Sequence, residues 1–178
     1  MLKNTLAEYG SVSKFLHWVV AVLVLVMLMG GFFLDDIPDS YKGTVYNIHK
    51  LTGLTILLLM VIRSVWNTFN VKPELAFDIP AWQKLLAKIT HLALYVFVIA
   101  MTMVGWIGAS AAGRPPQIAG VEFLYPIEHN KGLAKFMLNW HGSIALVLIG
   151  LISLHILAAL YHHFVRRDNT LMRMLPKK

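Results

Sequence analysis

The sequence predicts an all-α integral membrane protein, a four-helix bundle with both termini in the cytoplasm. Three observations support this prediction: a high apolar content, four apolar stretches long enough to cross a bilayer, and an uneven distribution of Lys and Arg between loops. The chain has 178 residues, of which 57% are hydrophobic and 14% charged, with a mean hydropathy of +0.63. A soluble domain carries about a quarter charged residues. We therefore expect membrane lipid to cover part of the apolar surface.

Four apolar stretches are long enough to cross the hydrocarbon core, which takes about 20 residues of helix. Because lipid offers no partner for backbone N–H and C=O groups, each stretch is predicted to be a helix. The predicted helices cover residues 15–34, 48–69, 89–112 and 136–164. Neither a repeat nor a separate soluble segment is visible, so residues 1–178 are predicted to form one transmembrane domain.

Three links connect the predicted helices. The first, residues 35–44, is acidic and contains Pro38; a signal-peptide cleavage site would have small residues there, so no cleavable signal is expected. The second, residues 67–88, leads into the sequence AWQKLLAKI, which predicts a short amphipathic segment before the third helix. The third, residues 113–135, is the longest.

The Lys and Arg residues indicate how the chain is oriented. Four spans place both termini on one side, and that side would hold eleven of the 16 Lys and Arg residues. Short loops rich in these residues stay in the cytoplasm. We therefore expect links 35–44 and 113–135 to face outward. No nucleic-acid partner is expected, because the basic residues lie in loops between spans.

Histidine is the residue type that points most clearly to a cofactor. The chain has no cysteine, which excludes disulfides, iron–sulfur clusters and covalent attachment of haem. It has eight histidines, and most lie within or beside apolar stretches. Ionisable residues are costly in that position and are usually functional.

His141 and His155 share one face of the fourth predicted helix, because their separation of fourteen positions is nearly four turns. They lie about 21 Å apart along the helix axis. His49 is expected at the outer level of His141, whereas His17 and His91 are expected at the inner level of His155. Each level can therefore supply the two imidazoles that a six-coordinate haem iron needs, and helix bundles commonly hold such sites.

Other interpretations of these histidines are open at this point. They could hydrogen-bond across helices, lie at the headgroup level or bind zinc, although zinc sites usually include Cys or carboxylate ligands. Either His17 or His91 could pair with His155. As a non-ligand, His91 could instead bind a haem propionate or a quinone oxygen.

Further polar residues lie near the two predicted levels. Arg63 shares the helix face of His49 at the inner level, where it could pair with a haem propionate or extend to lipid headgroups. Tyr161 and His162 could deliver protons to a quinone, or His162 could cap its helix. Four basic residues are predicted to attract an anionic substrate at the outer face: Lys50, Arg114, Lys131 and Lys135.

Six motifs are spread along nearly the whole chain: SKFLHW, NIHKLTG, LLMVIR, HLALYVFVIAMTMVGW, NWHGSIALVLIGLISLHILAALYHHF and RRDNTLMRMLP. Together they resemble the small bacterial cytochrome b561 proteins, and the ending D-N-T-L-x-R-M-x-P is unusual for a membrane tail. The resemblance implies a multi-pass protein of the bacterial inner membrane with two b-type haems. By position, it assigns His17 and His155 to the cytoplasmic haem and His49 and His141 to the periplasmic haem.

The resemblance also implies an activity, the transfer of electrons from periplasmic superoxide to ubiquinone by an oxidoreductase. Two other functions are open. The chain could be the cytochrome b subunit that links a periplasmic dehydrogenase or hydrogenase, a soluble redox partner, to the quinone pool. It could also be a membrane carrier of metal ions or protons that contains no haem.

Overall fold

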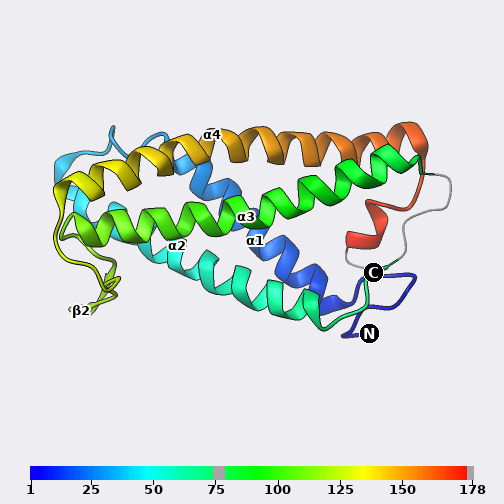
Figure 1. Ribbon diagram of the computed structural model, residues 1–178, viewed down its shortest axis with the longest axis horizontal. Coiled ribbons are helices and arrows are strands. Elements are labelled where there is room, and N and C mark those ends of the chain that lie inside the picture. The colour runs from blue at the N-terminus through cyan, green and yellow to red at the C-terminus, as the bar shows by residue number, and fades with distance from the viewer. Residues whose placement is uncertain (74–78, 176–178) are drawn as a thin grey trace.

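Four long helices dominate the computed structural model of the protein, which describes residues 1–73 and 79–175 (Figure 1). The helices are α1 (Ser11–Gly31), α2 (Asp39–Thr68), α3 (Ala81–Ala111) and α4 (Lys131–Tyr161). Each is long and apolar enough to cross a membrane. The prediction of an all-α protein with four membrane-spanning helices is therefore confirmed.

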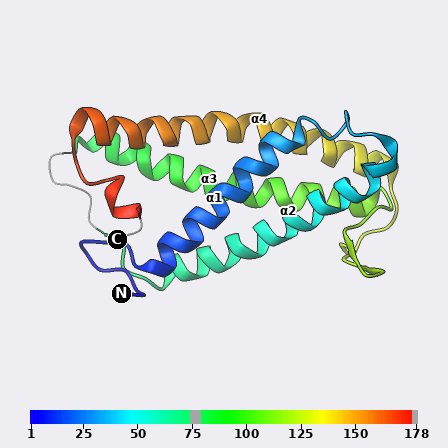
Figure 2. The same ribbon diagram turned by 180° about the vertical axis from the view of Figure 1, so that it is seen from behind.

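The helices form a bundle whose core lies near the middle of their length. Helices α3 and α4 run side by side, and α2 packs against both α1 and α3 (Figures 1 and 2). Every helix contributes to one cluster of buried apolar residues: Val20, Val24, Leu28, Ile56, Met60, Val98, Ile144 and Leu148. Large apolar side chains such as Val26 and Leu146 also cover the outside of the bundle, where lipid can surround them.

All four helices begin earlier than their apolar stretches predicted, and α1 begins at Ser11 rather than at residue 15. Helix α2 begins at Asp39 rather than at residue 48, and α3 begins at Ala81 rather than at residue 89, each directly after a proline. The fixed φ of proline suits the start of a helix, where its missing N–H is not needed. An apolar stretch indicates only the part of a helix that lies in the hydrocarbon core, so helix prediction from hydropathy leaves out the polar turns that extend beyond the core. The segment AWQKLLAKI is the beginning of α3, not a separate element.

Helix α4 also begins early, at Lys131 rather than at residue 136. The side chain of Asn130 accepts a hydrogen bond of 2.9 Å from the amide of Leu133, and asparagine is a preferred residue for this capping position. Lys131 and Lys135, which were predicted to lie in the link, therefore lie in the first turns of α4.

A two-stranded hairpin, which was not predicted, occupies the link before α4. Strands β1 (Gln117–Ile118) and β2 (Val121–Glu122) pair antiparallel. Ala119 and Gly120 join them with φ values of 48° and 82°, as a type I′ turn requires. The hairpin extends from one end of the bundle, and the N-terminus and the last described residues, up to Leu175, lie at the other end (Figures 1 and 2).

The N-terminal segment is held against the bundle by Asn4. The side-chain oxygen of Asn4 accepts hydrogen bonds from the Gly10 amide at 2.9 Å and the Ser13 hydroxyl at 2.7 Å. Its side-chain nitrogen donates to the Val71 carbonyl at 3.0 Å. One buried amide thereby joins the N-terminal segment, the start of α1 and the chain beyond α2.

The C-terminal segment returns from α4 to α1. After α4 the chain forms a π-helical turn (His162–Arg166) and a short 3₁₀ helix (Met172–Met174). Lys14 then donates to the Leu175 carbonyl, and the Trp18 indole donates to the Met174 carbonyl, both at 2.8 Å. These bonds connect the two helices that carry His17 and His155.

Contact between α3 and α4 should depend on Gly108. A Cβ atom at this position would lie 3.0 Å from the Leu138 Cδ2 atom and 3.3 Å from the Met137 Cβ atom. We expect Gly108→Val to lower the free energy of unfolding in detergent by about 1–3 kcal/mol through overpacking. Gly150→Val is the matched control, because an added Cβ at Gly150 meets nothing within 4 Å. Equal losses in the two variants would contradict this account of the helix contact.

Candidate functional site

Histidine rings face one another at two levels of the bundle. At the level nearer the hairpin, the ring centroids of His49 and His141 lie 6.1 Å apart. At the level nearer the termini, His155 lies 6.2 Å from His17 and 5.3 Å from His91. We call these the hairpin level and the termini level. The structure thus brings His49 close to His141, and both His17 and His91 close to His155, which is the grouping that the sequence predicts.

The spacing of two of these pairs suits axial ligation of an iron atom. Imidazole nitrogens bind first-row metals at about 2.0–2.1 Å, and the ring nitrogen lies about 1.15 Å from the ring centre, given ring bonds of about 1.35 Å. Two imidazoles that held one iron between them would therefore have centroids about 6.3 Å apart. The 6.1 Å and 6.2 Å pairs fit this distance, whereas the 5.3 Å between His91 and His155 is too short.

The apolar core lies between the two levels. On α4, Ile144 and Leu148 follow His141 and precede His155, and both are buried. On α3, the buried Val98 lies between His91 and the hairpin end of the helix. Buried apolar side chains therefore occupy the space between the two levels.

His141 has a hydrogen bond that orients its ring. Its Nδ1 atom lies 3.0 Å from the backbone carbonyl oxygen of Met101 on α3. A carbonyl can only accept, so Nδ1 carries the proton and donates it. The lone pair of Nε2 is then available to a metal, which is the usual arrangement of a metal-binding histidine.

Arg63 contacts the termini level from α2. Its guanidinium nitrogen lies 2.9 Å from Nδ1 of His17, and its carbon atom Cζ lies 5.1 Å from the centre of the Tyr95 ring. The Tyr95 hydroxyl in turn accepts a hydrogen bond from Asn67 at 3.1 Å. The side chain of Arg63 is therefore directed to neighbouring helices, not to lipid headgroups. Because arginine only donates, Nδ1 of His17 is the acceptor here.

The four basic residues predicted to attract an anion do not have the same surroundings. The ammonium group of Lys50 donates to the carbonyls of Arg114 and Pro115 at 2.9 Å and 3.1 Å. Lys50 therefore holds the loop before the hairpin, with two of its three N–H groups engaged. The side chains of Arg114, Lys131 and Lys135 are exposed at the same end of the protein.

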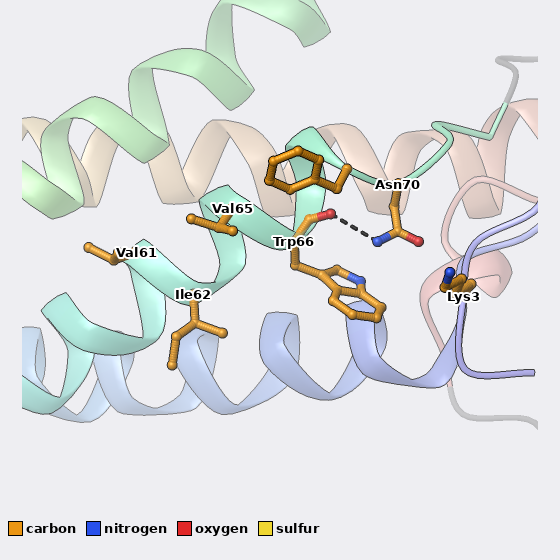
Figure 3. A pocket seen from close by; sticks show the side chains of 7 residues that line it. Lys3, Val61, Ile62, Val65, Trp66 and Asn70 are labelled. Carbon is orange, nitrogen blue, oxygen red and sulfur yellow. Dashed lines mark hydrogen bonds between the residues drawn. The ribbon is translucent and has the colours of Figure 1, made fainter.

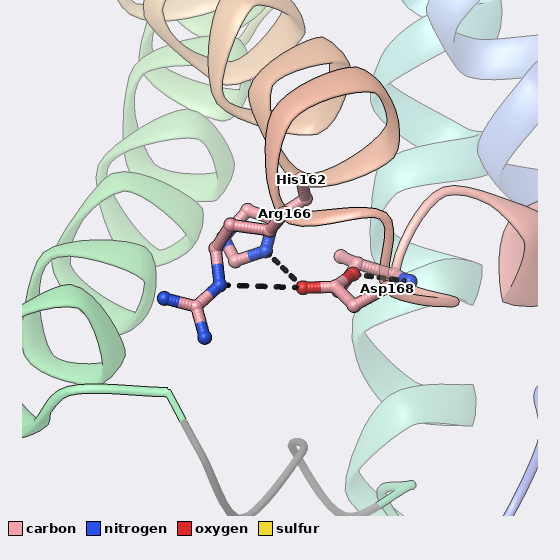
Figure 4. Close-up of polar contacts among 4 residues, drawn as sticks. His162, Arg166 and Asp168 are labelled. Carbon is pink, nitrogen blue, oxygen red and sulfur yellow. Dashed lines mark hydrogen bonds and ion pairs between the residues drawn. The ribbon is translucent and has the colours of Figure 1, made fainter.

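His162 forms part of a polar cluster beyond α4 (Figure 4). Its Nδ1 atom lies 2.5 Å from the Asp168 carboxylate, which also lies 3.8 Å from Nε of Arg166 and accepts from the Thr170 amide. Partial burial raises the pKa of the Asp168 carboxyl, but the hydrogen bonds from Thr170 and His162 outweigh burial and hold that pKa below its usual range. Tyr161, the neighbouring residue, is exposed.

Two surface recesses lie near the termini. One, of about 470 Å³, is lined mainly by apolar side chains of α2, with Lys3 and Asn70 at its edge (Figure 3). The other, of about 860 Å³, lies around the start of α1 and includes Lys14 and Trp18. Neither recess is lined by a paired histidine, so the histidine levels are a separate feature of the bundle.

Three contributors to the site have no signal in the sequence. The Met101 carbonyl is a backbone group, which every residue has. Gly105, which lies against the His141 ring, cannot be distinguished in the sequence from a glycine that only allows helices to pack closely. Asp168 belongs to a motif noted in the sequence, but its contact with His162 depends on a turn that no pattern predicts. Within the described residues, no group of three His, Cys, Asp or Glu side chains is arranged to hold a metal ion by itself.

Comparison with known proteins gives a consistent result. Residues 8–177 match the family described as "Prokaryotic cytochrome b561". "Cytochrome b561 homolog 2" of Escherichia coli (strain K12) is 29% identical, over 98% of this chain and 94% of the relative. "Probable superoxide oxidase CybB" of Yersinia pestis is 30% identical, over 96% and 97%. "Cytochrome b562" of Cereibacter sphaeroides is 24% identical, over 94% of each chain.

The Asp168 cluster should hold the C-terminal turn closed. We expect Asp168→Asn to expose the turn and to speed tryptic cleavage at residues 166–173 about tenfold, which corresponds to about 1.5 kcal/mol for a charge-assisted hydrogen bond. Asp36→Asn, at an exposed position in the link between α1 and α2, is the control and should leave cleavage unchanged. Because the folded pKa of Asp168 is lowered, its contribution should be present above about pH 4 and disappear as the pH falls further. Unchanged cleavage of Asp168→Asn would contradict this role.

Proposed function

We propose that this chain, which belongs to the prokaryotic cytochrome b561 family, transfers electrons from periplasmic superoxide to ubiquinone. Membership of the family makes it a multi-pass bacterial membrane protein that takes part in electron transfer and binds haem b. The observation that carries the proposal is the spacing of two histidine pairs, 6.1 Å and 6.2 Å between centroids, at two levels of the bundle. In this proposal the protein lies in the inner membrane with both termini in the cytoplasm.

We assign a haem to each level. His49 and His141 are the proposed ligands at the hairpin level, which faces the periplasm, and His17 and His155 are those at the termini level. Bound haem supplies a one-electron redox centre. The 5.3 Å between His91 and His155 supports His17 as the ligand and leaves His91 as a neighbour of the site.

Arg63 is proposed to contact a propionate of the haem at the termini level. An imidazole that binds metal through Nε2 carries its proton on Nδ1, and arginine cannot accept that proton. Ligation by His17 through Nε2 therefore requires Arg63 to leave Nδ1, which frees its guanidinium for a carboxylate. The paired N–H groups of arginine are well suited to that partner.

The hairpin end suits an anionic electron donor. Arg114, Lys131 and Lys135 are exposed there, and clustered positive charge raises both the local concentration and the encounter rate of small anions. Lys50 supports this surface by holding its loop, so its role in attraction is smaller than that of the exposed residues. The resemblance to a probable superoxide oxidase supports superoxide as the anion.

The termini end suits a quinone. Two superoxide ions give two electrons and leave as dioxygen, and one ubiquinone takes up these electrons with two protons from the cytoplasm. His91, Tyr161 and His162 are the proposed proton donors. Of these, His162 is held by Asp168, and an imidazole paired with a carboxylate is oriented for proton transfer.

The hairpin also favours a second candidate function. Ile118 and Val121, one on each strand, are both more than half exposed, at 54% and 63%. Exposed apolar residues beside basic ones could dock a soluble periplasmic dehydrogenase or hydrogenase. The two functions differ in what the protein does alone: quinone reduction by superoxide with the purified protein would favour the first, and a requirement for a partner the second.

The proposed ligands can be tested by haem content. We expect His49→Ala and His17→Ala each to retain one haem of two in a pyridine haemochrome assay, because one axial bond is lost at one level. His91→Ala is the matched control and should retain both haems. If His17→Ala retained both haems and His91→Ala lost one, the ligand at the termini level would be His91 on α3 and not His17.

The proposed donor can be tested by rapid mixing with superoxide. The haems should be reduced much faster than in a control that contains superoxide dismutase, and Lys131→Gln with Lys135→Gln should slow that reduction by up to about tenfold at low salt. Lys3→Gln, at the opposite end, should leave the rate unchanged. Reduction no faster than the control would exclude superoxide as the donor.

A further inference from the structure

The His141 ring lies directly on the backbone of α3 at Gly105. A Cβ atom built at Gly105 would be 2.9 Å from both Cε1 and Nδ1 of His141, closer than real Cβ atoms approach other heavy atoms. The same ring donates from Nδ1 to the Met101 carbonyl at 3.0 Å. The His141 ring therefore lies against the backbone of Gly105 while its Nδ1 atom donates to the Met101 carbonyl.

Helix geometry explains why a glycine is required at this distance from Met101. In an α-helix the Met101 carbonyl accepts the amide of the residue four positions on, which is Gly105. A carbonyl oxygen has a second lone pair, and His141 uses it. Any side chain at Gly105 would begin with a Cβ atom 2.9 Å from Nδ1 and Cε1 of His141, so the ring would have to move away from the helix.

We propose that Gly105 is a positioning residue for the His141 ligand: its lack of a side chain lets Nδ1 bond to the Met101 carbonyl, which directs Nε2 to the haem iron. This inference rests on the ligation that is proposed above. Donation from Nδ1 makes an imidazole a more basic ligand, and a more basic ligand stabilises oxidised iron. Gly105 thereby lowers the reduction potential at the hairpin level.

The termini level has the opposite environment. There a cation, Arg63, lies beside His17 and over Tyr95, where the hairpin level has a backbone carbonyl. With haem bound, Arg63 is proposed to pair with a propionate, whose negative charge offsets its own, so we assign it no effect on the potential. The hydrogen bond at His141 lowers the potential at the hairpin level, and this is the order that moves electrons from the hairpin end to the termini end.

The test compares Gly105→Ala with Gly108→Ala in a redox titration of the two haems. Gly108 is the matched control, because it lies one turn along the same helix and its added Cβ would meet Leu138 and Met137 instead of His141. We expect Gly105→Ala to raise the lower of the two midpoint potentials and to change the low-spin EPR signal of that haem. The other haem should be unaffected, and Gly108→Ala should change neither.

Two outcomes would overturn the inference. One is an unchanged lower midpoint in Gly105→Ala with both haems present, and the other is an equal shift in the Gly108→Ala control. If Gly105→Ala does not accumulate, pulsed EPR on the wild-type protein labelled with ¹⁵N-histidine decides instead: a hydrogen-bonded remote nitrogen at one haem is expected, and its absence refutes the bond. A wild-type protein that binds no haem would instead refute the proposed function.

Discussion

Close packing of α3 against α4 is the constraint on which the arrangement of the histidines depends. Helix α4 supplies a histidine to each level, and α3 contacts both of them, through Gly105 under His141 and through His91 beside His155. Lipid tails are as apolar as leucine, so helices in a membrane associate through tight packing of small residues and through hydrogen bonds. Here both forces act at one place, because the glycine that permits the approach also permits the bond to the Met101 carbonyl.

The two levels combine a shared geometry with different surroundings. Their facing rings have nearly equal spacing, and buried apolar residues such as Leu148 separate one level from the other. A carbonyl accepts from the His141 ring at one level, whereas at the other level an arginine lies beside the His17 ring and is proposed to move to a haem propionate. Two sites built from the same ligand type can thus differ in redox behaviour, since hydrogen bonds and charge around the ligands set the potential.

Hydrogen bonds between distant segments hold both ends of the bundle. Lys50 bonds to the loop before the hairpin, and Lys14 and Trp18 bond to the C-terminal segment. These residues look in the sequence like charges and aromatic residues at a membrane surface. Their partners are backbone carbonyls, which no sequence pattern distinguishes. The sequence also placed the beginnings of the helices too late, because hydropathy follows the hydrocarbon core, whereas Pro38, Pro80 and Asn130 mark where three of the helices begin.

The sequence by itself determined the number of helices and the grouping of the histidines into two levels. Both depend on quantities that run along one helix, the length of an apolar stretch and the rise per residue. Only the tertiary structure decided how far His17 and His91 each lie from His155, where Arg63 points, and why position 105 has no side chain. The physical reason is that these features depend on the separation and rotation of neighbouring helices. Side-chain packing across the bundle determines both quantities, and the periodicity of a single helix contains no information about them.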